Sequence, residues 1–217
     1  MNLERYFDHT NLSPNAGKIE IKKLCDEAIE YGFFSVCIQP CYVVYAKELL
    51  KESDIKIATV VGFPQGQNTR ATKVFEAMDA IKNGADEIDM VLNFGALKDG
   101  RYKEVYEEIS QIKEACGKTV LKVIFETSQL SDEQIIKACE LSDNAGADFV
   151  KTSTGFLGQG ATLDQVKLMH KHSRAKVKAS GGIRSLEDAL SMIEAGASRL
   201  GSSSGIVIMQ QLGHENV

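Results

Sequence analysis

Short apolar runs alternate with longer segments of helical spacing along the whole chain. The runs are rich in β-branched and aromatic residues, a composition that favours strands. They cover residues 6–8, 33–38, 56–61, 86–92, 119–125, 147–151, 175–179 and 197–201. Strands that alternate with helices are typical of parallel βαβ units. Eight such strands predict an α/β protein with a single (β/α)8 barrel over residues 1–217, and an open doubly wound sheet is the alternative.

The segments between the strands carry helix signals. Apolar residues recur at helical spacing, and three segments open with the polar pair of a capping box or a near match to one. The spaced apolar sets are Val74, Met78 and Ile81, and Leu186, Leu190 and Ile193; the polar pairs are Ser131 with Gln134, Thr162 with Gln165, and Ser185 with Asp188. No Gly-x-Gly-x-x-Gly motif follows the first strand, which disfavours a dinucleotide-binding open sheet.

Four segments resemble one another when they are aligned on a glycine: YGFFSVC, NGADEID, AGADFVK and AGASRLG. Each glycine fits the position just after a helix, and a strand follows at once. Five residues beyond the glycine the chain carries Cys37, Asp89, Lys151 and Gly201 respectively. These positions fall near the carboxyl ends of strands, where barrel enzymes build their sites. The repeat therefore predicts that chemically different groups meet at one mouth.

Two lysines end consecutive predicted strands, Lys151 in ADFVK and Lys178 in AKVKA. Neighbouring parallel strands lie about 4.8 Å apart, so both ammonium groups can reach the same mouth. An apolar wall and a second cation lower a lysine pKa, and the neutral amine can then form a Schiff base with a carbonyl. Asp89 offers a carboxylate for the proton transfers of that reaction. The structural alternative is a salt bridge between Asp89 and a lysine.

Two glycine-containing loops follow the last two predicted strands, SGGIRS at residues 180–185 and RLGSSSG at residues 199–205. Loops in these positions often bind phosphate through backbone N–H groups and a helix N-terminus. Arg184 is the candidate charged partner, and an exposed arginine at a helix start is the alternative. VVGFPQGQNT at residues 60–69 is expected to shape the mouth, and Lys122 is expected to pair with Asp89 or Glu126.

Composition and charge exclude several classes of protein. Residues are 43% hydrophobic, the net charge is −5, and no basic face for nucleic acid is evident. No apolar stretch is long enough to span a membrane, and no secretion signal opens the chain. Five cysteines without paired CxxC units indicate reduced thiols and a cytoplasmic protein. His170 and His172 are interpreted as exposed helix residues, and His9 stands alone near a strand end, so no metal site is predicted.

Taken together, the motifs resemble those of the deoxyribose-phosphate aldolase family. The resemblance runs in order over nearly the whole chain, and FVKTSTGF with KASGGIRS is its most specific part. The matching segments are DHTNL (8–12), SVCIQP (35–40), VVGFPQG (60–66), EIDMVLNFGALK (87–98), KVIFET (122–127), FVKTSTGF (149–156), KASGGIRS (178–185) and RLGSSSG (199–205).

The resemblance implies a class I aldolase without metal or other cofactor on a (β/α)8 barrel. It would reversibly cleave the phosphosugar 2-deoxy-D-ribose 5-phosphate to acetaldehyde and D-glyceraldehyde 3-phosphate. Lys151 would form the Schiff base, Lys178 would perturb it and share in proton transfer, and Asp89 would donate and accept protons. Candidate substrate- and phosphate-binding residues are Asp8, Cys37, Thr152, Gly155, Gly181, Gly182, Arg184, Gly201, Ser203 and Ser204.

Two positions depart from the family pattern. Gln39 stands where many relatives carry asparagine, and Phe156 stands where some carry a lysine that helps to hold phosphate. Phosphate affinity would then depend more on backbone N–H groups and Arg184. A rival lysine-dependent aldolase for another phosphosugar, and a silent barrel that only binds a sugar phosphate, are the competing hypotheses. A homodimer is expected, because soluble enzymes are often two-fold homo-oligomers.

Overall fold

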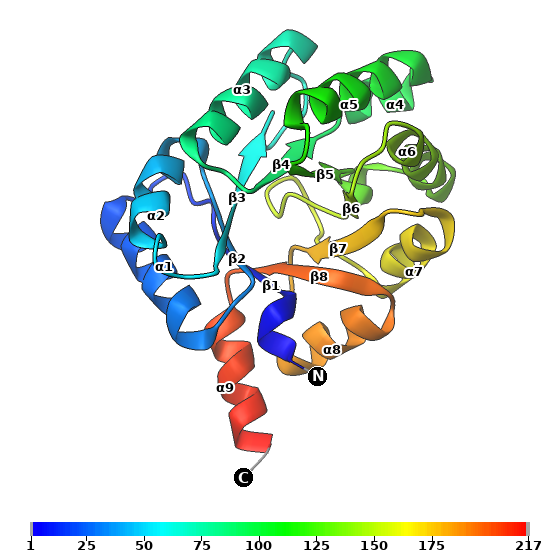
Figure 1. Ribbon diagram of the computed structural model, residues 1–217. Coiled ribbons are helices and arrows are strands. Elements are labelled where there is room, and N and C mark those ends of the chain that lie inside the picture. The colour runs from blue at the N-terminus through cyan, green and yellow to red at the C-terminus, as the bar shows by residue number, and fades with distance from the viewer. Residues whose placement is uncertain (1, 216–217) are drawn as a thin grey trace.

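Eight parallel strands close into one barrel in the computed structural model, which describes residues 2–215 (Figure 1). Each strand pairs with the next one in the chain, and β8 pairs with β1. The strands are β1 (Phe7–Asn11), β2 (Ser35–Ile38), β3 (Lys56–Val61), β4 (Glu87–Val91), β5 (Val120–Ile124), β6 (Phe149–Lys151), β7 (Lys176–Ser180) and β8 (Ala197–Ser202). The predicted barrel is confirmed, and the open sheet is excluded.

Helices form a ring outside the barrel (Figure 1). They are α1 (Lys18–Tyr31), α2 (Val43–Leu49), α3 (Arg70–Asn83), α4 (Phe94–Lys98), α5 (Tyr102–Cys116), α6 (Asp132–Asn144), α7 (Leu163–His172), α8 (Leu186–Glu194) and α9 (Gly205–Glu215), with 3-10 turns at Leu3–Tyr6, Pro40–Tyr42 and Thr127–Gln129. Within the described residues, no helix is long and apolar enough to cross a membrane.

The aligned glycines end helices as predicted. Gly32, Gly84, Gly146 and Gly196 have φ values of 67°, 111°, 78° and 111°, a backbone region that glycine adopts without strain. The predicted caps are also present. Ser131 and Ser185 form complete capping boxes with Gln134 and Asp188, whereas Thr162 accepts a hydrogen bond from the Gln165 N–H without the reciprocal contact.

The apolar residues spaced along α3 and α8 mark these helices, as predicted, but they do not all lie on the buried faces. Met78 and Leu190 are exposed, and their neighbours in those sets are only half-buried, apart from Leu186. The buried stripe of α3 is instead Lys73, Ala77 and Ala80. Small alanines let the helix axis approach the strands closely, and the bulkier side chains then lie at the flanks of the contact.

Side chains along the strands alternate between two environments, as the pleat requires. On β4, Ile88 and Met90 pack into the apolar cluster between the barrel and its helices, whereas Glu87 and Asp89 point into the barrel. Lys122, Lys178 and Arg199 occupy inward positions on β5, β7 and β8. The barrel interior is therefore a layer of paired charges below its carboxyl-terminal mouth.

Candidate active site

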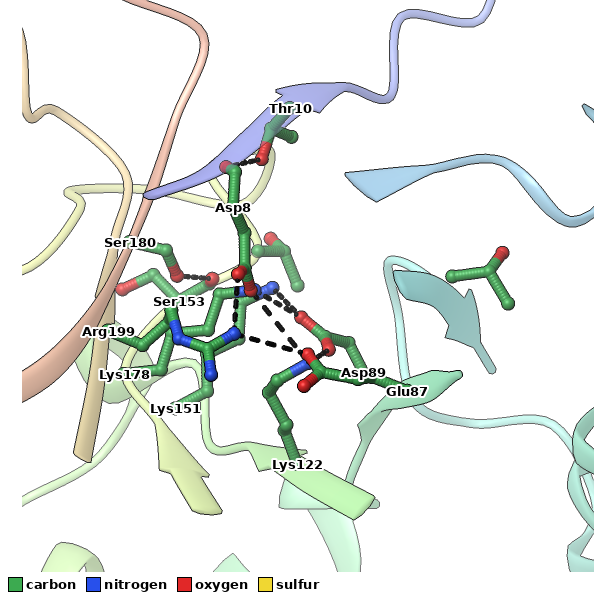
Figure 2. Close-up of polar contacts among 12 residues, drawn as sticks. Asp8, Thr10, Glu87, Asp89, Lys122, Lys151, Ser153, Lys178, Ser180 and Arg199 are labelled. Atoms are coloured by element: carbon green, nitrogen blue, oxygen red, sulfur yellow. Dashed lines mark hydrogen bonds and ion pairs between the residues drawn. The ribbon is translucent and has the colours of Figure 1, made fainter. Parts of the chain in front are cut away.

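Asp89 lies at the centre of three lysines (Figure 2). Its Oδ2 accepts hydrogen bonds from Lys151 Nζ at 2.7 Å and from Lys178 Nζ at 2.8 Å. Its Oδ1 accepts a hydrogen bond from Lys122 Nζ at 2.7 Å. Lys151 and Lys178 are directly opposite in the β6–β7 register, which places their side chains on the same face of the sheet. The sequence-predicted trio of Lys151, Lys178 and Asp89 does meet, and Lys122 joins it.

A second group of charges lies below this trio. Asp8 contacts Lys178 Nζ, and its Oδ1 accepts hydrogen bonds from Ser35 Oγ at 2.7 Å and from Arg199 Nη1 at 2.8 Å. Glu87 Oε2 lies 2.5 Å from Lys122 Nζ and 3.3 Å from Arg199 Nη1. Asp8, Asp89, Lys122 and Lys178 are completely buried. The cluster is preorganised because each charge is fixed by partners from other strands.

Lys151 and Lys178 respond differently to their surroundings. Burial lowers the pKa of Lys151; Asp89 opposes this shift, and the Lys178 ammonium reinforces it. Burial also disfavours the charged form of Lys178, but Asp8 and Asp89 outweigh it and raise its pKa. Lys178 therefore stays an ammonium group, whereas Lys151 is the amine that more readily loses its proton.

Asp89 remains ionised in this environment. Burial by itself would raise its pKa, but Lys122, Lys151 and Lys178 together hold that pKa well below the usual value for an aspartate. A carboxylate that contacts both a neutral amine and an ammonium group can accept a proton and relay one between them. The arrangement is chemically suited to forming and hydrolysing an imine at Lys151.

A cavity of about 790 Å³ opens over Lys151. Its walls come from the ends of β1, β6, β7 and β8, the loops that follow these strands, and one face of α1. Lys151 lines it, and so do the predicted binding residues Gly155, Gly181, Gly182, Arg184, Gly201, Ser203 and Ser204. The two glycine-containing loops thus share one cavity with Lys151, at the carboxyl ends of the strands.

The loop after β7 is held tightly at its helix end. Asp188 Oδ2 accepts hydrogen bonds from the N–H groups of Arg184 and Ser185, each at 3.0 Å. The Ser202 hydroxyl donates to Ile183 O at 2.7 Å and accepts from the Ser204 N–H at 2.9 Å, which links the two loops. These contacts leave Gly182 and Ser203 as the more open parts of the rim, with the Arg184 side chain exposed beside them.

Three predicted binding residues lie away from the cavity wall. The Thr152 hydroxyl is buried, donates to Ser180 O at 3.1 Å and accepts from the Ser180 N–H at 3.0 Å, so it joins β6 to β7. Asp8 lies in the charge layer below. Cys37 is buried in a small apolar cluster inside the barrel, where burial raises the pKa of its thiol.

Gly201 has a steric role in addition to its place on the cavity wall. A Cβ at this position would lie 2.9 Å from Ser180 Cβ and 3.1 Å from Lys178 Cε. Any side chain at residue 201 would therefore displace the stem of Lys178. The glycine on β8 keeps the space in which the Lys178 ammonium reaches Asp89.

The two residues that depart from the family pattern are both accommodated. Gln39 Nε2 donates to Leu12 O at 3.0 Å, which joins the segments after β2 and β1. Phe156 lines the cavity and packs edge-on against Phe63, with ring centroids 5.2 Å apart. The loop at residues 60–69 thus reaches the mouth through Phe63, as expected, and gives that side of the rim an aromatic surface.

Glu126 is a site-adjacent residue whose role the sequence did not reveal. Its backbone is left-handed, with φ of 57°, which is unusual for a residue other than glycine. Its Oε2 accepts hydrogen bonds from Thr154 N at 3.0 Å and from Thr154 Oγ1 at 2.5 Å. Thr154 Oγ1 in turn accepts one from the Phe156 N–H at 3.1 Å. Glu126 therefore fixes the loop that follows Lys151, and of the two partners expected for Lys122 it is Asp89 that Lys122 contacts.

Two histidines are exposed on a helix, as expected, whereas His9 lies in the middle of β1 and has a partner. His170 and His172 are exposed on α7, and His9 is buried with its Nε2 2.8 Å from Glu27 Oε2. Among the described residues, no group of three or more His, Cys, Asp or Glu side chains is arranged to hold a metal ion.

Comparison with known proteins agrees with this geometry. Residues 4–211 match the family described as DeoC/LacD family aldolase. The chain belongs to the DeoC/LacD aldolase family. A deoxyribose-phosphate aldolase of Caldanaerobacter subterraneus subsp. tengcongensis is 59% identical over 216 residues, covering 97% of this chain and 94% of that protein. One from Staphylococcus carnosus is 56% identical over 214 residues, covering 98% and 97%.

A solved structure shows the same fold in this aldolase family. The deoxyribose phosphate aldolase of Aeropyrum pernix, described as a tetramer, superposes with a TM-score of 0.91 at 35% identity. The match covers 97% of this chain and 91% of that one. The chain is thus an aldolase over nearly its full length, as its motifs implied.

Proposed function

We propose that this aldolase reversibly cleaves 2-deoxy-D-ribose 5-phosphate to acetaldehyde and D-glyceraldehyde 3-phosphate by a class I, Schiff-base mechanism. The observation that carries the proposal is the Lys151 amine, which faces the cavity while Asp89 joins it to the Lys178 ammonium. The names of the Caldanaerobacter and Staphylococcus relatives support the choice of substrate.

In the proposed reaction, neutral Lys151 attacks the C1 aldehyde of the open-chain sugar. The carbinolamine loses water and becomes an iminium ion, with Asp89 and Lys178 relaying the protons. Removal of the proton from the C3 hydroxyl breaks the C2–C3 bond and releases D-glyceraldehyde 3-phosphate. The bond electrons pass to the iminium and form an enamine. Protonation of the enamine at C2 and hydrolysis of the imine then release acetaldehyde and restore Lys151.

The rim supplies the proposed phosphate site. Gly155, Gly181, Gly182, Ser203 and Ser204 surround the same cavity as Lys151, and Arg184 adds a positive charge at its edge. Backbone N–H groups in glycine-rich turns at helix starts suit a phosphate group. Asp8, Cys37 and Thr152 would act from below the cavity surface by holding the lysines and the strands in place.

Product analysis tests the proposed reaction. Incubation with 2-deoxy-D-ribose 5-phosphate should release acetaldehyde and D-glyceraldehyde 3-phosphate in equal amounts. Ribose 5-phosphate, which differs by a 2-hydroxyl, is the matched control and should react far more slowly. Faster cleavage of another phosphosugar would favour the rival aldolase, and binding without cleavage of any phosphosugar would favour the silent barrel.

Oligomeric state and location are separate parts of the proposal. We expect a homodimer in the cytoplasm, where its free cysteines, Cys41 among them on the surface, stay reduced. Sedimentation equilibrium checks the first point, and a tetramer, as described for the Aeropyrum pernix relative, would correct it.

A further inference from the structure

The charge layer inside the barrel contains more groups than the proposed chemistry uses. Glu87 and Arg199 lie two residues before Asp89 and Gly201, on the same inward faces of β4 and β8, and both are buried. The Arg199 guanidinium lies 3.6 Å from the centroid of the Phe34 ring and donates to Asp8 and Glu87. Neither residue lines the cavity over Lys151 within the described part of the chain. Their influence on the reaction must pass through other residues.

The number of charges in the cluster is odd. Its ionisable groups are four bases and three carboxylates, joined by direct contacts across the barrel (Figure 2). The bases are Lys122, Lys151, Lys178 and Arg199, and the carboxylates are Asp8, Glu87 and Asp89. With every base protonated, one positive charge is unmatched, and an unmatched buried charge is costly. The cluster becomes neutral when one base gives up its proton.

Contacts within the cluster determine which base that is. Arginine does not deprotonate in proteins. Lys122 contacts the carboxylates of Glu87 and Asp89, and Lys178 contacts those of Asp8 and Asp89. Lys151 contacts Asp89 alone, and Asp89 is shared with the other two lysines. Lys151 is therefore the least neutralised of the four bases and also the one that opens to the cavity.

Other titratable groups around Lys151 do not change this balance. Cys37 on β2 is a buried thiol that stays neutral, and Lys56, at the start of β3, is exposed. On the α1 side of the cavity, Glu27 pairs with His9 and Lys23, and Glu20 accepts the Gly17 N–H. Arg184 is exposed at the rim.

We propose that Arg199 and Glu87 are positioning residues that set the protonation state of Lys151 by fixing the excess of bases over carboxylates at one. The Arg199 guanidinium pairs with Asp8 and is the fourth base of the cluster, so the cluster is neutral only when one lysine loses its proton. Glu87 shares with Asp89 the neutralisation of Lys122, which leaves part of the Asp89 charge for the other lysines. The inference rests on the proposed Schiff-base function and adds to it the origin of the neutral amine.

Charge-changing variants at the two positions should act in opposite directions. In Arg199→Gln three bases face three carboxylates, so Lys151 keeps its proton to higher pH. In Glu87→Gln four bases face two carboxylates, so Lys151 loses its proton at lower pH. The double variant again has one base more than it has carboxylates, and Arg199→Lys keeps that excess unchanged. If the variants only damaged the packing of the barrel, the two single variants would not shift the Lys151 titration in opposite directions, and the double variant would not return to the parent value.

The test is the pH dependence of imine trapping at Lys151, with acetaldehyde and cyanoborohydride followed by peptide mapping. Acetaldehyde avoids the titration of a substrate phosphate. The acid limb of the curve of adduct formation against pH should move up by about one pH unit in Arg199→Gln and down by about one in Glu87→Gln. The double variant and Arg199→Lys should stay close to the parent.

The outcomes separate the inference from the proposed function. No adduct at Lys151 of the parent at any pH would overturn both. An adduct in the parent, with single variants that shift in the same direction or not at all, would overturn the inference alone. Thermal unfolding is recorded for each variant. If Arg199→Gln alone does not fold, the double variant is compared with Glu87→Gln. The acid limb of the double variant must then lie about one pH unit higher, and the same or a lower position overturns the inference.

Discussion

Two buried lysines of this aldolase, Lys73 and Lys151, have similar burial but different surroundings. Lys73 lies on α3 outside the barrel, and its Nζ donates to Gly66 O at 2.6 Å, Val91 O at 2.8 Å and Glu108 Oε1 at 2.8 Å. Lys151 ends β6 at the mouth, and its Nζ donates to Asp89 Oδ2, an oxygen that Lys178 also contacts. Burial lowers the pKa of both lysines.

The difference lies in the acceptors that surround each ammonium group. An ammonium has three donors, and three oxygens satisfy those of Lys73 completely. Lys151 shares one carboxylate with two other lysines and faces a cavity, so its neutral form is less disfavoured. Burial alone therefore does not distinguish Lys151 from Lys73. A shortage of acceptors beside a cavity of about 790 Å³ does.

The largest expected effect is the loss of turnover in Lys151→Met. Without the amine no imine can form, and kcat should fall by about 10⁵-fold or more, as it does when other enzymes lose a covalent nucleophile. A steady-state assay of acetaldehyde release measures it. Activity within tenfold of the parent would show that the reaction does not pass through Lys151.

Asp89→Asn tests the shared carboxylate. Loss of a proton-transferring group should lower kcat by about 10²–10⁴-fold. The same change leaves Lys122, Lys151 and Lys178 without their common counter-charge, so thermal unfolding should occur at lower temperature. Glu108→Gln is the matched control, since it removes a buried carboxylate outside the barrel. Equal kcat values for the two variants would show that the carboxylate beside Lys151 is no more important for turnover than the one beside Lys73.

Lys73→Met examines the other side of the comparison. The change leaves Glu108 buried without its partner and should lower the free energy of unfolding by about 3–5 kcal/mol. Because the hydrogen bonds of Lys73 go to Gly66, Val91 and Glu108 and not to Asp89, Lys151 or Lys178, kcat per folded molecule should stay close to the parent value. Denaturant titration and kinetics measure the two quantities. The double variant Lys73→Met/Glu108→Leu should recover part of the lost free energy of unfolding. A double variant less stable than Lys73→Met would argue that the unpaired Glu108 charge is not what destabilises the single variant.

The smallest expected effect is that of Glu126→Gln. The amide oxygen can still accept from Thr154, but with a weaker bond than a carboxylate, which is worth about 1 kcal/mol. The loop after Lys151 should loosen, with KM for the phosphosugar rising about fivefold and kcat changing little. Glu133→Gln on the exposed face of α6 is the control. A change confined to kcat would point to a role of Glu126 in proton transfer instead.

Much of the fold was predictable because local signals and barrel geometry agree. The four aligned glycines end helices with positive φ, and the strand that the alignment requires follows each of them within three residues. The meeting of Lys151 with Lys178 follows from the parallel register, whereas both contact Asp89, in the middle of β4, across the closed barrel. The spaced apolar residues marked these helices but not their whole buried faces: the buried residues of α3 are Lys73, Ala77 and Ala80, and on α8 Leu186 is buried while Leu190 is exposed.

The depth of the site was not predictable from strand ends alone. The segments EID and RLG do hold the inward residues Glu87 and Arg199 two positions before Asp89 and Gly201. Period-two alternation of charged residues in an otherwise apolar strand was the available signal. The contacts of Arg199 with Asp8 and Glu87 depend on how the barrel closes, which no local pattern specifies. Glu126 accepts hydrogen bonds from Thr154 in place of Lys122, and this contact too depends on the tertiary structure.

The most direct test of the account compares the two buried lysines in one experiment. The parent is incubated with 2-deoxy-D-ribose 5-phosphate and borohydride, digested, and mapped by mass spectrometry, with Lys151→Met treated alongside. A reduced adduct on Lys151, with Lys73 unmodified and no adduct in the variant, is the predicted result. No adduct on the parent, or one that persists in Lys151→Met, would contradict the Schiff-base assignment.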